Sequence, residues 1–446
     1  MSRLPRIVCC LALLLSLAST SLTPRQTQQP KMQPFTVEKV QQMLKDGYNE
    51  VRKNYYDKGC HGIDWDAKYH QLEESAKQIT SLAQGLTLVA SLMMNLNDSH
   101  TFFIPPSRPL RTEYGFRMIM IGDRAFISRV RPGTDAESKV HAGDEIVSYN
   151  RYRVDRPSLW KLNYYVNSLA PNPATALVLK SPEGLQREEN VLAKTQQLKR
   201  VMDLTLADGG LDYFQMMRDN DASYHIIRQR SYELGDVMIW KMPQFDLDDT
   251  AIDHWFGIAR KHKTLILDLR ENPGGYVFTL EHMLGELFDH DVKIADRVGR
   301  KDMKPQIAKS RGKDAFNGRI IVLVDSGSAS CAELFARVIQ LEKRGIVIGD
   351  RTSGKVMESK QYGEMQGADT RIFYAFSVTD ANLIMADGKS LENVGVTPDE
   401  FVLPTGKDLA EAKDPALARA AELAGLTLEP AAAGKLFPFE WLPMTQ

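Results

Sequence analysis

The sequence predicts an α/β protein whose central sheet is largely parallel, with helices packed on its faces. From Val237 onward, short aliphatic runs alternate with segments of helical periodicity, and this alternation is typical of strand–helix–strand units. Turns rich in glycine and serine follow two of the strands directly, and open α/β sheets bind ligands at the carboxyl ends of their strands. The predicted strands are 237–240, 264–270, 321–325 and 345–348.

One strand–turn–helix unit stands out as a candidate catalytic element. The aliphatic strand 321–325 leads into a run of small residues that ends at Ser330, and apolar residues at helical spacing follow it. A side chain at the N-terminus of a helix faces free N–H groups and the positive end of the helix dipole, which favour developing negative charge. Ser330 is therefore the candidate nucleophile. The alternative is a serine-rich turn that only caps a helix.

The N-terminus has the pattern of a secretory signal peptide, predicted over residues 1–22. A short basic start precedes an apolar run of about a dozen residues and then small residues. This run is short for a membrane span, although an N-terminal anchor is the alternative. Removal of the segment would leave Cys60 and Cys331, so a disulfide framework is not expected. One bridge between these two cysteines is the remaining alternative.

Residues 35–106 are expected to form a small helical domain. Its last helical pattern stops before the sequence Asn97-Asp98-Ser99-His100-Thr101. A histidine at this place suits two roles. It can cap the preceding helix through the helix dipole, or it can act as a general base near neutral pH.

Residues 111–194 have short strand and turn patterns in place of the preceding helical ones, and they resemble a PDZ domain. Tyr114-Gly115-Phe116 is similar to the Gly-Phe loop of that family, and Ala142-Gly143-Asp144 to its second glycine turn. The resemblance implies capture of an extended chain by strand addition, with Tyr114, Gly115 and Phe116 binding substrate. The alternative is an ordinary β-rich insert without a ligand.

The α/β core is expected over 200–405, and a C-terminal helix and tail over 406–446. The whole chain carries a formal net charge of −1, so its charge does not argue for binding to nucleic acid. The basic run 293–313 suits a solvated loop better than an acidic-substrate site.

Taken in order, the motifs resemble the carboxy-terminal processing (tail-specific) serine proteases and their relative, the tricorn core protease. The resemblance extends from about residue 35 to 403. It implies a crotonase-like protease core, a helical N-terminal segment and an inserted PDZ domain. The motifs that carry it are Asp98-Ser99-His100-Thr101, residues 268–275, Ser328-Ala329-Ser330-Cys331-Ala332-Glu333, residues 349–355 and residues 392–399.

Two catalytic arrangements exist among these relatives, and the sequence carries parts of both. In the tail-specific form a lysine activates the serine, and Lys355 stands at the matching position. Residue 359 is serine where that form has glutamine. In the tricorn form the base is a histidine preceded by a serine, and Ser99, His100 and Glu392 match it. The tricorn-like arrangement is preferred.

The resemblance then implies a role for each residue. Ser330 attacks the scissile carbonyl, His100 moves the proton, and Ser99 and Glu392 orient the site. Backbone N–H groups of Gly275 and Cys331 would hold the oxyanion. Lys355 becomes an electrostatic helper, and no metal or cofactor is expected.

The predicted function is a periplasmic or secreted serine endopeptidase that cleaves proteins or peptides, with a preference for sites near C-termini. Neither a nucleic-acid partner nor a membrane span is expected after removal of the signal, and an oligomer stays open. The alternatives are a Ser-Lys protease using Lys355, a catalytically idle ligand-binding relative, a PDZ scaffold, and a thiol nucleophile at Cys331.

Overall fold

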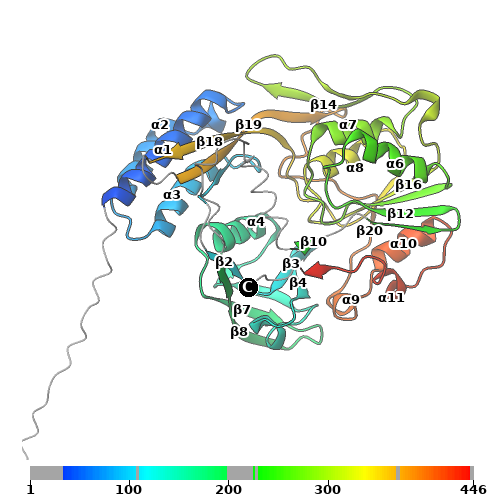
Figure 1. The fold of residues 1–446 in the computed structure, drawn as a ribbon, viewed down its shortest axis with the longest axis horizontal. Helices are drawn as coiled ribbons and strands as arrows, with labels where there is room; N and C mark the ends of the chain where they lie inside the picture. The colour runs from blue at the N-terminus through cyan, green and yellow to red at the C-terminus, as the bar shows by residue number, and fades with distance from the viewer. Residues whose placement is uncertain (1–33, 107–109, 198–224, 227–229, 368–371, 442–446) are drawn as a thin grey trace, which may run out of the picture.

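The computed structural model describes residues 34–106, 110–197, 225–226, 230–367 and 372–441. The expected signal peptide at 1–22 lies outside these ranges. Figure 1 shows three parts: an N-terminal group of helices at one end, the α/β core at the other, and a β-rich insert beside both. Within the described part of the chain, no helix is both long enough and apolar enough to cross a bilayer.

Three helices form the N-terminal part, as the sequence predicts. They are α1 (Pro34–Asn54), α2 (Trp65–Ala76) and α3 (Leu82–Met94). Side chains of Asp64 and Ser81 cap the starts of α2 and α3 by accepting backbone N–H bonds. The apolar faces of the helices share one core with Tyr374 and Phe376 of a long strand, β19 (Ile372–Met385). The helical part is therefore packed onto a sheet.

That strand belongs to a second sheet, which carries the segment after α3. The strand order is β1-β19-β14-β15, and β18 also pairs with β19. Phe102 of β1 lies opposite Ser377 of β19, so the residues just before β1 have a defined position. The other members are β1 (Phe102–Ile104), β14 (Val292–Gly299), β15 (Gln306–Ala308) and β18 (Met357–Gln366).

The insert begins and ends in one two-stranded ribbon, because β2 (Leu110–Glu113) pairs antiparallel with β9 (Lys194–Gln197). Its sheet has the order β3-β4-β5-β7-β8, and β6 pairs with β5. The helix α4 (Arg156–Tyr164) continues as one π-helical turn, Tyr165–Leu169. The strands are β3 (Phe116–Ile121), β4 (Arg124–Val130), β5 (Glu145–Tyr149), β6 (Tyr152–Arg153), β7 (Ala174–Lys180) and β8 (Gln186–Leu192).

The α/β core is built on a six-stranded sheet in the order β11-β12-β13-β16-β17-β20. Within this sheet, β12, β13, β16, β17 and β20 run parallel to one another, and β11 is antiparallel at one edge. The expectation of a largely parallel sheet is thus confirmed. The strands are β11 (Arg230–Leu234), β12 (Val237–Lys241), β13 (Thr264–Asp268), β16 (Arg319–Val324), β17 (Ile346–Gly349) and β20 (Glu400–Phe401).

Successive residues of the core strands point to opposite faces, and each face has its own helices (Figure 1). One face packs against α6 (Asp249–Ala259), α7 (Val277–Gly285) and α8 (Cys331–Leu341). The other packs against the C-terminal segment. Both faces are covered, which is why these strands read as continuous aliphatic runs.

The C-terminal segment departs from the single helix expected there. It forms three short helices, α9 (Gly406–Ala410), α10 (Pro415–Leu423) and α11 (Pro430–Ala433). Pro415 and Pro430 each occupy a helix start, since proline lacks the N–H that a continuing helix requires. The last described strand, β21 (Glu440–Trp441), pairs with β10 (His225–Ile226).

Candidate active site

Ser330 is the N-cap residue of α8 and follows the turn that leaves β16. Its backbone angles are φ 54° and ψ −118°, outside the regions that residues with a Cβ ordinarily occupy. Such a conformation persists only where the surroundings hold it, and it occurs preferentially at functional sites. The side chain is partly exposed. The backbone thus has the strained strand-to-helix turn that presents a nucleophile.

The buried carboxylate of Glu333, in the first turn of α8, stabilises this conformation. Its Oε1 accepts the Thr352 hydroxyl at 2.5 Å and the Gly354 N–H at 2.8 Å. Its Oε2 accepts the N–H of Lys355 at 2.9 Å and of Ser330 at 3.1 Å. Burial raises the pKa of Glu333 to about 7, against the opposing effect of these donors. These contacts join the serine turn to the segment 352–355.

A second turn, after β13, packs directly against the serine. A Cβ added to Gly274 would lie 2.6 Å from the Cβ of Ser330 and 3.0 Å from the Cys331 nitrogen. A Cβ added to Gly275 would lie 2.2 Å from the Phe245 carbonyl oxygen. Only glycine fits at either position. The two residues expected to supply oxyanion donors, Gly275 and Cys331, therefore lie on adjoining segments.

Asn272 ties this second turn to its surroundings. Its side chain donates to the carbonyl of Met242 at 2.9 Å and accepts the N–H of Gly274 at 2.8 Å. Its own carbonyl accepts the N–H of Ala329, the residue before Ser330, at 2.9 Å. The asparagine is fully buried. It therefore aligns the glycine turn with the serine turn through one set of hydrogen bonds.

The thiol of Cys331 is buried and donates to the Gly275 carbonyl at 3.4 Å. Burial raises its pKa to about 12, so it stays protonated at neutral pH. A buried thiol of this kind is a poor nucleophile, which argues against the thiol mechanism. Cys60 and Cys331 are both buried and free, so the bridge considered from the sequence is absent.

His100 lies beyond the end of α3, which finishes at Met94 with Asn95 as its C-cap. The alternative that His100 caps this helix is therefore wrong. Its position comes from Asp98, whose Oδ1 accepts the N–H of His100 at 3.0 Å and of Thr101 at 2.6 Å. The hydroxyl of Thr379 in β19 also donates to this oxygen, at 2.8 Å.

Ser99 links the imidazole to a carboxylate from the far end of the sequence. Its Oγ lies 2.8 Å from His100 Nδ1 and donates to Glu392 Oε2 at 2.8 Å, and its N–H donates to Glu392 Oε1 at 2.7 Å. Because the hydroxyl proton goes to the carboxylate, the hydroxyl oxygen accepts from Nδ1–H. This assignment leaves Nε2 without a proton, the form that a general base requires.

One peptide group connects the serine half of the site (Ser330 and Glu333) to the histidine half (His100, Ser99 and Glu392). The carbonyl of Lys355 accepts the N–H of Ser330 at 2.9 Å. The N–H of Val356, in the same peptide group, donates to Glu392 Oε2 at 2.8 Å. Glu392 in turn holds Ser99 beside His100. The structure thus brings together Ser330, His100, Ser99, Glu392 and Lys355, residues that come from four separate stretches of sequence.

Burial lowers the pKa of His100 to about 4, the positive charge of Lys355 acts in the same direction, and Asp98 opposes both. Burial also lowers the pKa of Lys355, while the charges of Glu333 and Glu392 oppose that shift. The Lys355 ammonium lies 5.3 Å from the ring centre of Trp160 in α4. This environment therefore favours the neutral form of the imidazole.

A cleft of about 1390 Å³ opens between the core and the insert. Ser99, from the segment after α3, and Lys355, from the core, line one side, and Met118 and Trp160 line the insert side. Ser330 and His100 are not lining residues themselves, although their hydrogen-bonded neighbours are. The cleft is large enough to admit a segment of polypeptide.

The residues expected to bind substrate, Tyr114, Gly115 and Phe116, lie outside the lining of this cleft. The Tyr114 hydroxyl instead donates to the Asn172 carbonyl at 2.9 Å and accepts the Asn172 N–H at 3.1 Å. The next residues of β3, from Arg117 to Met120, do line the cleft. Substrate contact by the Tyr114 segment stays a prediction.

Two family profiles match this chain. The profile described as "Peptidase family S41" matches residues 236–402, which include Ser330, Lys355 and Glu392. The chain therefore contains a peptidase family S41 domain. Members of this family are serine-type peptidases, and the sequence-based assignment is confirmed. The "Tricorn protease C1 domain" profile matches residues 36–82 of the helical part.

Named relatives of this S41 peptidase are distant. The tail-specific protease of Haemophilus influenzae is 24% identical over 68% of this chain and 43% of its own length. The chloroplastic C-terminal processing peptidase of Tetradesmus obliquus is 26% identical, over 82% of this chain and 78% of its own length. The chain thus spans less than half of the first relative and most of the second.

Among solved structures, mature CPAF has the same fold. The match has a TM-score of 0.63 at 15% identity and covers 84% of this chain and 94% of CPAF. At this identity the similarity concerns the fold alone. The α/β prediction is confirmed at that level.

Several site residues were not identified from the sequence. Thr379 and Trp160 touch the catalytic segments but carry no motif that marks them. Asp98 lies in a quoted motif, and a short acidic residue followed by two polar ones is a recognisable turn signal. Glu333 ends a quoted motif, and its four donors make it a structural contact of the serine turn.

Proposed function

We propose that this S41 peptidase is a secreted serine endopeptidase with a Ser330/His100/Ser99/Glu392 site. The observation that carries the proposal is the continuous hydrogen-bonded path from His100 through Ser99 and Glu392 to the peptide group that holds Ser330. An orienting carboxylate that acts on the imidazole through a serine serves the purpose of the third member of a conventional triad.

In the proposed mechanism Ser330 Oγ attacks the scissile carbonyl carbon while His100 Nε2 accepts the hydroxyl proton. The C=O bond electrons move to oxygen, and the N–H groups of Gly275 and Cys331 stabilise the oxyanion. Each such donor lowers the barrier by about 3 kcal/mol. Collapse of the intermediate expels the amine, which takes the proton from His100. Water then repeats the sequence and releases the carboxylic acid.

A Ser-Lys mechanism is the second candidate. The lowered pKa of the Lys355 ammonium favours it, because a lysine acts as a base only when burial or a neighbour reduces its basicity. Ser359, at the position where that form has glutamine, instead accepts a hydrogen bond from Ser377 at 3.1 Å. The separate effects of His100 and Lys355 substitutions distinguish the two mechanisms.

The insert supplies the proposed route for substrate. We retain its assignment as a PDZ-like domain, and that of the core as crotonase-like, as parts of the proposal. The edge strand β3 and the helix α4 both line the cleft that reaches Lys355, so an extended chain added along β3 would lead toward the site. Unstructured proteins and peptides, bound near their C-termini, are the proposed substrates.

The deciding experiment compares purified wild-type protein with its Ser330→Ala variant on casein, an unstructured substrate. A fluorophosphonate that labels activated serines provides a second readout. We expect cleavage and labelling in the wild type, and a loss of at least about 10⁴-fold in Ser330→Ala.

The matched control is Ser75→Ala, on the exposed side of α2, which should behave as the wild type. Loss of one partly exposed hydroxyl at position 330 should change stability by less than about 0.5 kcal/mol. Equal cleavage by the wild type and Ser330→Ala would refute the assignment. A wild type that neither cleaves nor labels would favour an idle, ligand-binding relative.

A further inference from the structure

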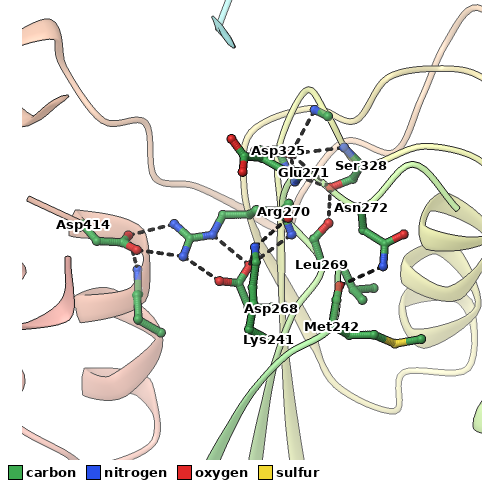
Figure 2. A network of polar contacts seen from close by, with 12 residues as sticks. Lys241, Met242, Asp268, Leu269, Arg270, Glu271, Asn272, Asp325, Ser328 and Asp414 are labelled. Carbon is green, nitrogen blue, oxygen red and sulfur yellow. Dashed lines mark hydrogen bonds and ion pairs between the residues drawn. The ribbon is translucent and has the colours of Figure 1, made fainter. Parts of the chain in front are cut away.

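A charged network joins the C-terminal segment to the base of the glycine turn (Figure 2). Arg270 lies between two carboxylates. Its guanidinium donates to both oxygens of Asp414 at 2.7 and 2.8 Å and to both oxygens of Asp268 at 2.7 and 2.9 Å. Lys241 adds a second cation, 3.1 Å from Asp268. The positive charges of Arg270 and Lys241 thus balance the negative charges of Asp268 and Asp414.

The members of this network are largely withdrawn from solvent. Asp268 is 1% exposed and Lys241 is 6% exposed. The side chains of Arg270 and Asp414 retain 19% and 17%. Bidentate pairing at such depth fixes the orientation of the arginine as well as its charge. If the Asp414 carboxylate were removed, Asp268 alone would face two buried cations, which is costly.

The network acts on the peptide group that begins the glycine turn. Lys241 Nζ donates to the carbonyl of Arg270 at 2.6 Å, and the N–H of Glu271 donates to Asp325 Oδ1 at 2.8 Å. Both ends of this peptide group are therefore held. Glu271 has φ 60°, an unfavourable angle for a residue with a Cβ, so the turn depends on such restraint.

Asp325 carries the restraint across to the serine turn. The same Oδ1 accepts the N–H of Gly327 at 2.9 Å and of Ser328 at 3.1 Å. Both residues lie in the turn that ends at Ser330. A path of hydrogen bonds thus leads from Asp414 through Arg270 to the two turns that flank the proposed oxyanion site.

We propose that Asp414 is a positioning residue for catalysis, which holds the Gly274–Gly275 turn against Ser330 through Arg270. The C-terminal segment is then part of the catalytic apparatus rather than only a cover for the sheet. This inference rests on the proposed function, because it concerns the turn that would bind the oxyanion. A purely structural role would affect folding stability without a separate effect on turnover.

The test exploits a second role of Asp414. Its carboxylate also caps α10, accepting the Leu417 N–H at 2.9 Å. Serine is an equally good N-cap residue, so Asp414→Ser keeps the cap and removes the partner of Arg270. Asp414→Asn is a milder variant for use if Asp414→Ser does not fold. The matched control is Glu400→Gln. Glu400 accepts a hydrogen bond at 2.7 Å from Arg419 of α10, the helix that Asp414 caps. Glu400 lies far along the chain from the glycine turn.

Peptide cleavage, fluorophosphonate labelling and thermal unfolding would be measured for all variants, well below each melting temperature. We expect kcat and the labelling rate of Asp414→Ser to fall at least about tenfold with KM within about twofold, because small displacements of catalytic groups are costly. Glu400→Gln should keep the wild-type kcat. An unchanged kcat in Asp414→Ser or Asp414→Asn, or an equal loss in Glu400→Gln, would overturn the proposal.

Hydrogen–deuterium exchange gives a readout that does not need activity. The amides of residues 271, 272, 274 and 275 should exchange several-fold faster in Asp414→Ser than in the wild type or Glu400→Gln, since their restraint is weakened. If the wild type proved inactive, the proposed function would fail, while exchange would still decide whether Asp414 positions the turn. Unchanged exchange in that segment would refute the positioning role.

Discussion

Ser330 and His100 are held in place in different ways. Most of the serine half is local: a strand, a turn and the first turn of α8, with Glu333 three residues after the nucleophile. The histidine half depends on distant segments, since Ser99 and Glu392 are 293 residues apart. The difference indicates that damage to Glu333 should act through the serine turn, whereas damage to the helical part or β19 should act through the base.

The largest expected difference between the halves concerns the base. His100→Ala should reduce kcat/KM by about 10³- to 10⁴-fold, since it removes proton transfer from the reaction. Lys355→Ala should cost only about tenfold, because its cation affects the site through space. Steady-state cleavage of one fluorogenic peptide by both variants checks this ranking. The reverse order would assign the chain to the Ser-Lys class.

The next test breaks the serine half alone. Glu333→Gln places an amide NH₂ group where two of four donors now meet a carboxylate, and a buried donor without an acceptor costs about 1–3 kcal/mol. We expect a lower free energy of unfolding in urea and a reduced labelling rate. Glu342→Gln, at the exposed end of the same helix, is the matched control. Equal stability of the two variants would contradict the role given to Glu333.

A smaller effect is expected from loosening the base half. Glu392→Gln keeps the shape of the side chain but weakens its bonds to Ser99, so the imidazole loses part of its orientation. We expect kcat to fall about 10- to 100-fold. KM and the final extent of fluorophosphonate labelling should be nearly unchanged. Cleavage kinetics at saturating peptide would measure it. Wild-type turnover would show that the Ser99–Glu392 link is dispensable.

The smallest effect is a shift in pH dependence. Activity requires neutral His100, whose pKa of about 4 lies below the usual value, so kcat/KM should stay high down to about pH 5. The positive charge of Lys355 disfavours the imidazolium form. Lys355→Met should therefore raise the pKa of His100 and move the acid limb of the profile to higher pH. An acid limb near pH 6.5 that Lys355→Met leaves in place would contradict this electrostatic coupling.

Local patterns accounted for most of the architecture. Aliphatic runs located the parallel strands, because strands covered on both faces contain few polar residues. The serine turn was visible because strand, small residues and helix are contiguous. The prediction for the C-terminal segment was less accurate. Its alanine-rich composition suggested one helix, whereas Pro415 and Pro430 each begin a new one.

By itself, the sequence determined the order of elements, the serine at a helix N-terminus and the glycines that must approach it. These features depend on backbone conformation and spacing, which neighbouring residues specify. Only the tertiary structure decided which distant groups meet: Glu392 with Ser99, and Asp414 with Arg270, 144 residues apart. Such contacts leave no periodic signal, because a charged residue in a loop reads the same whether it faces solvent or a buried partner.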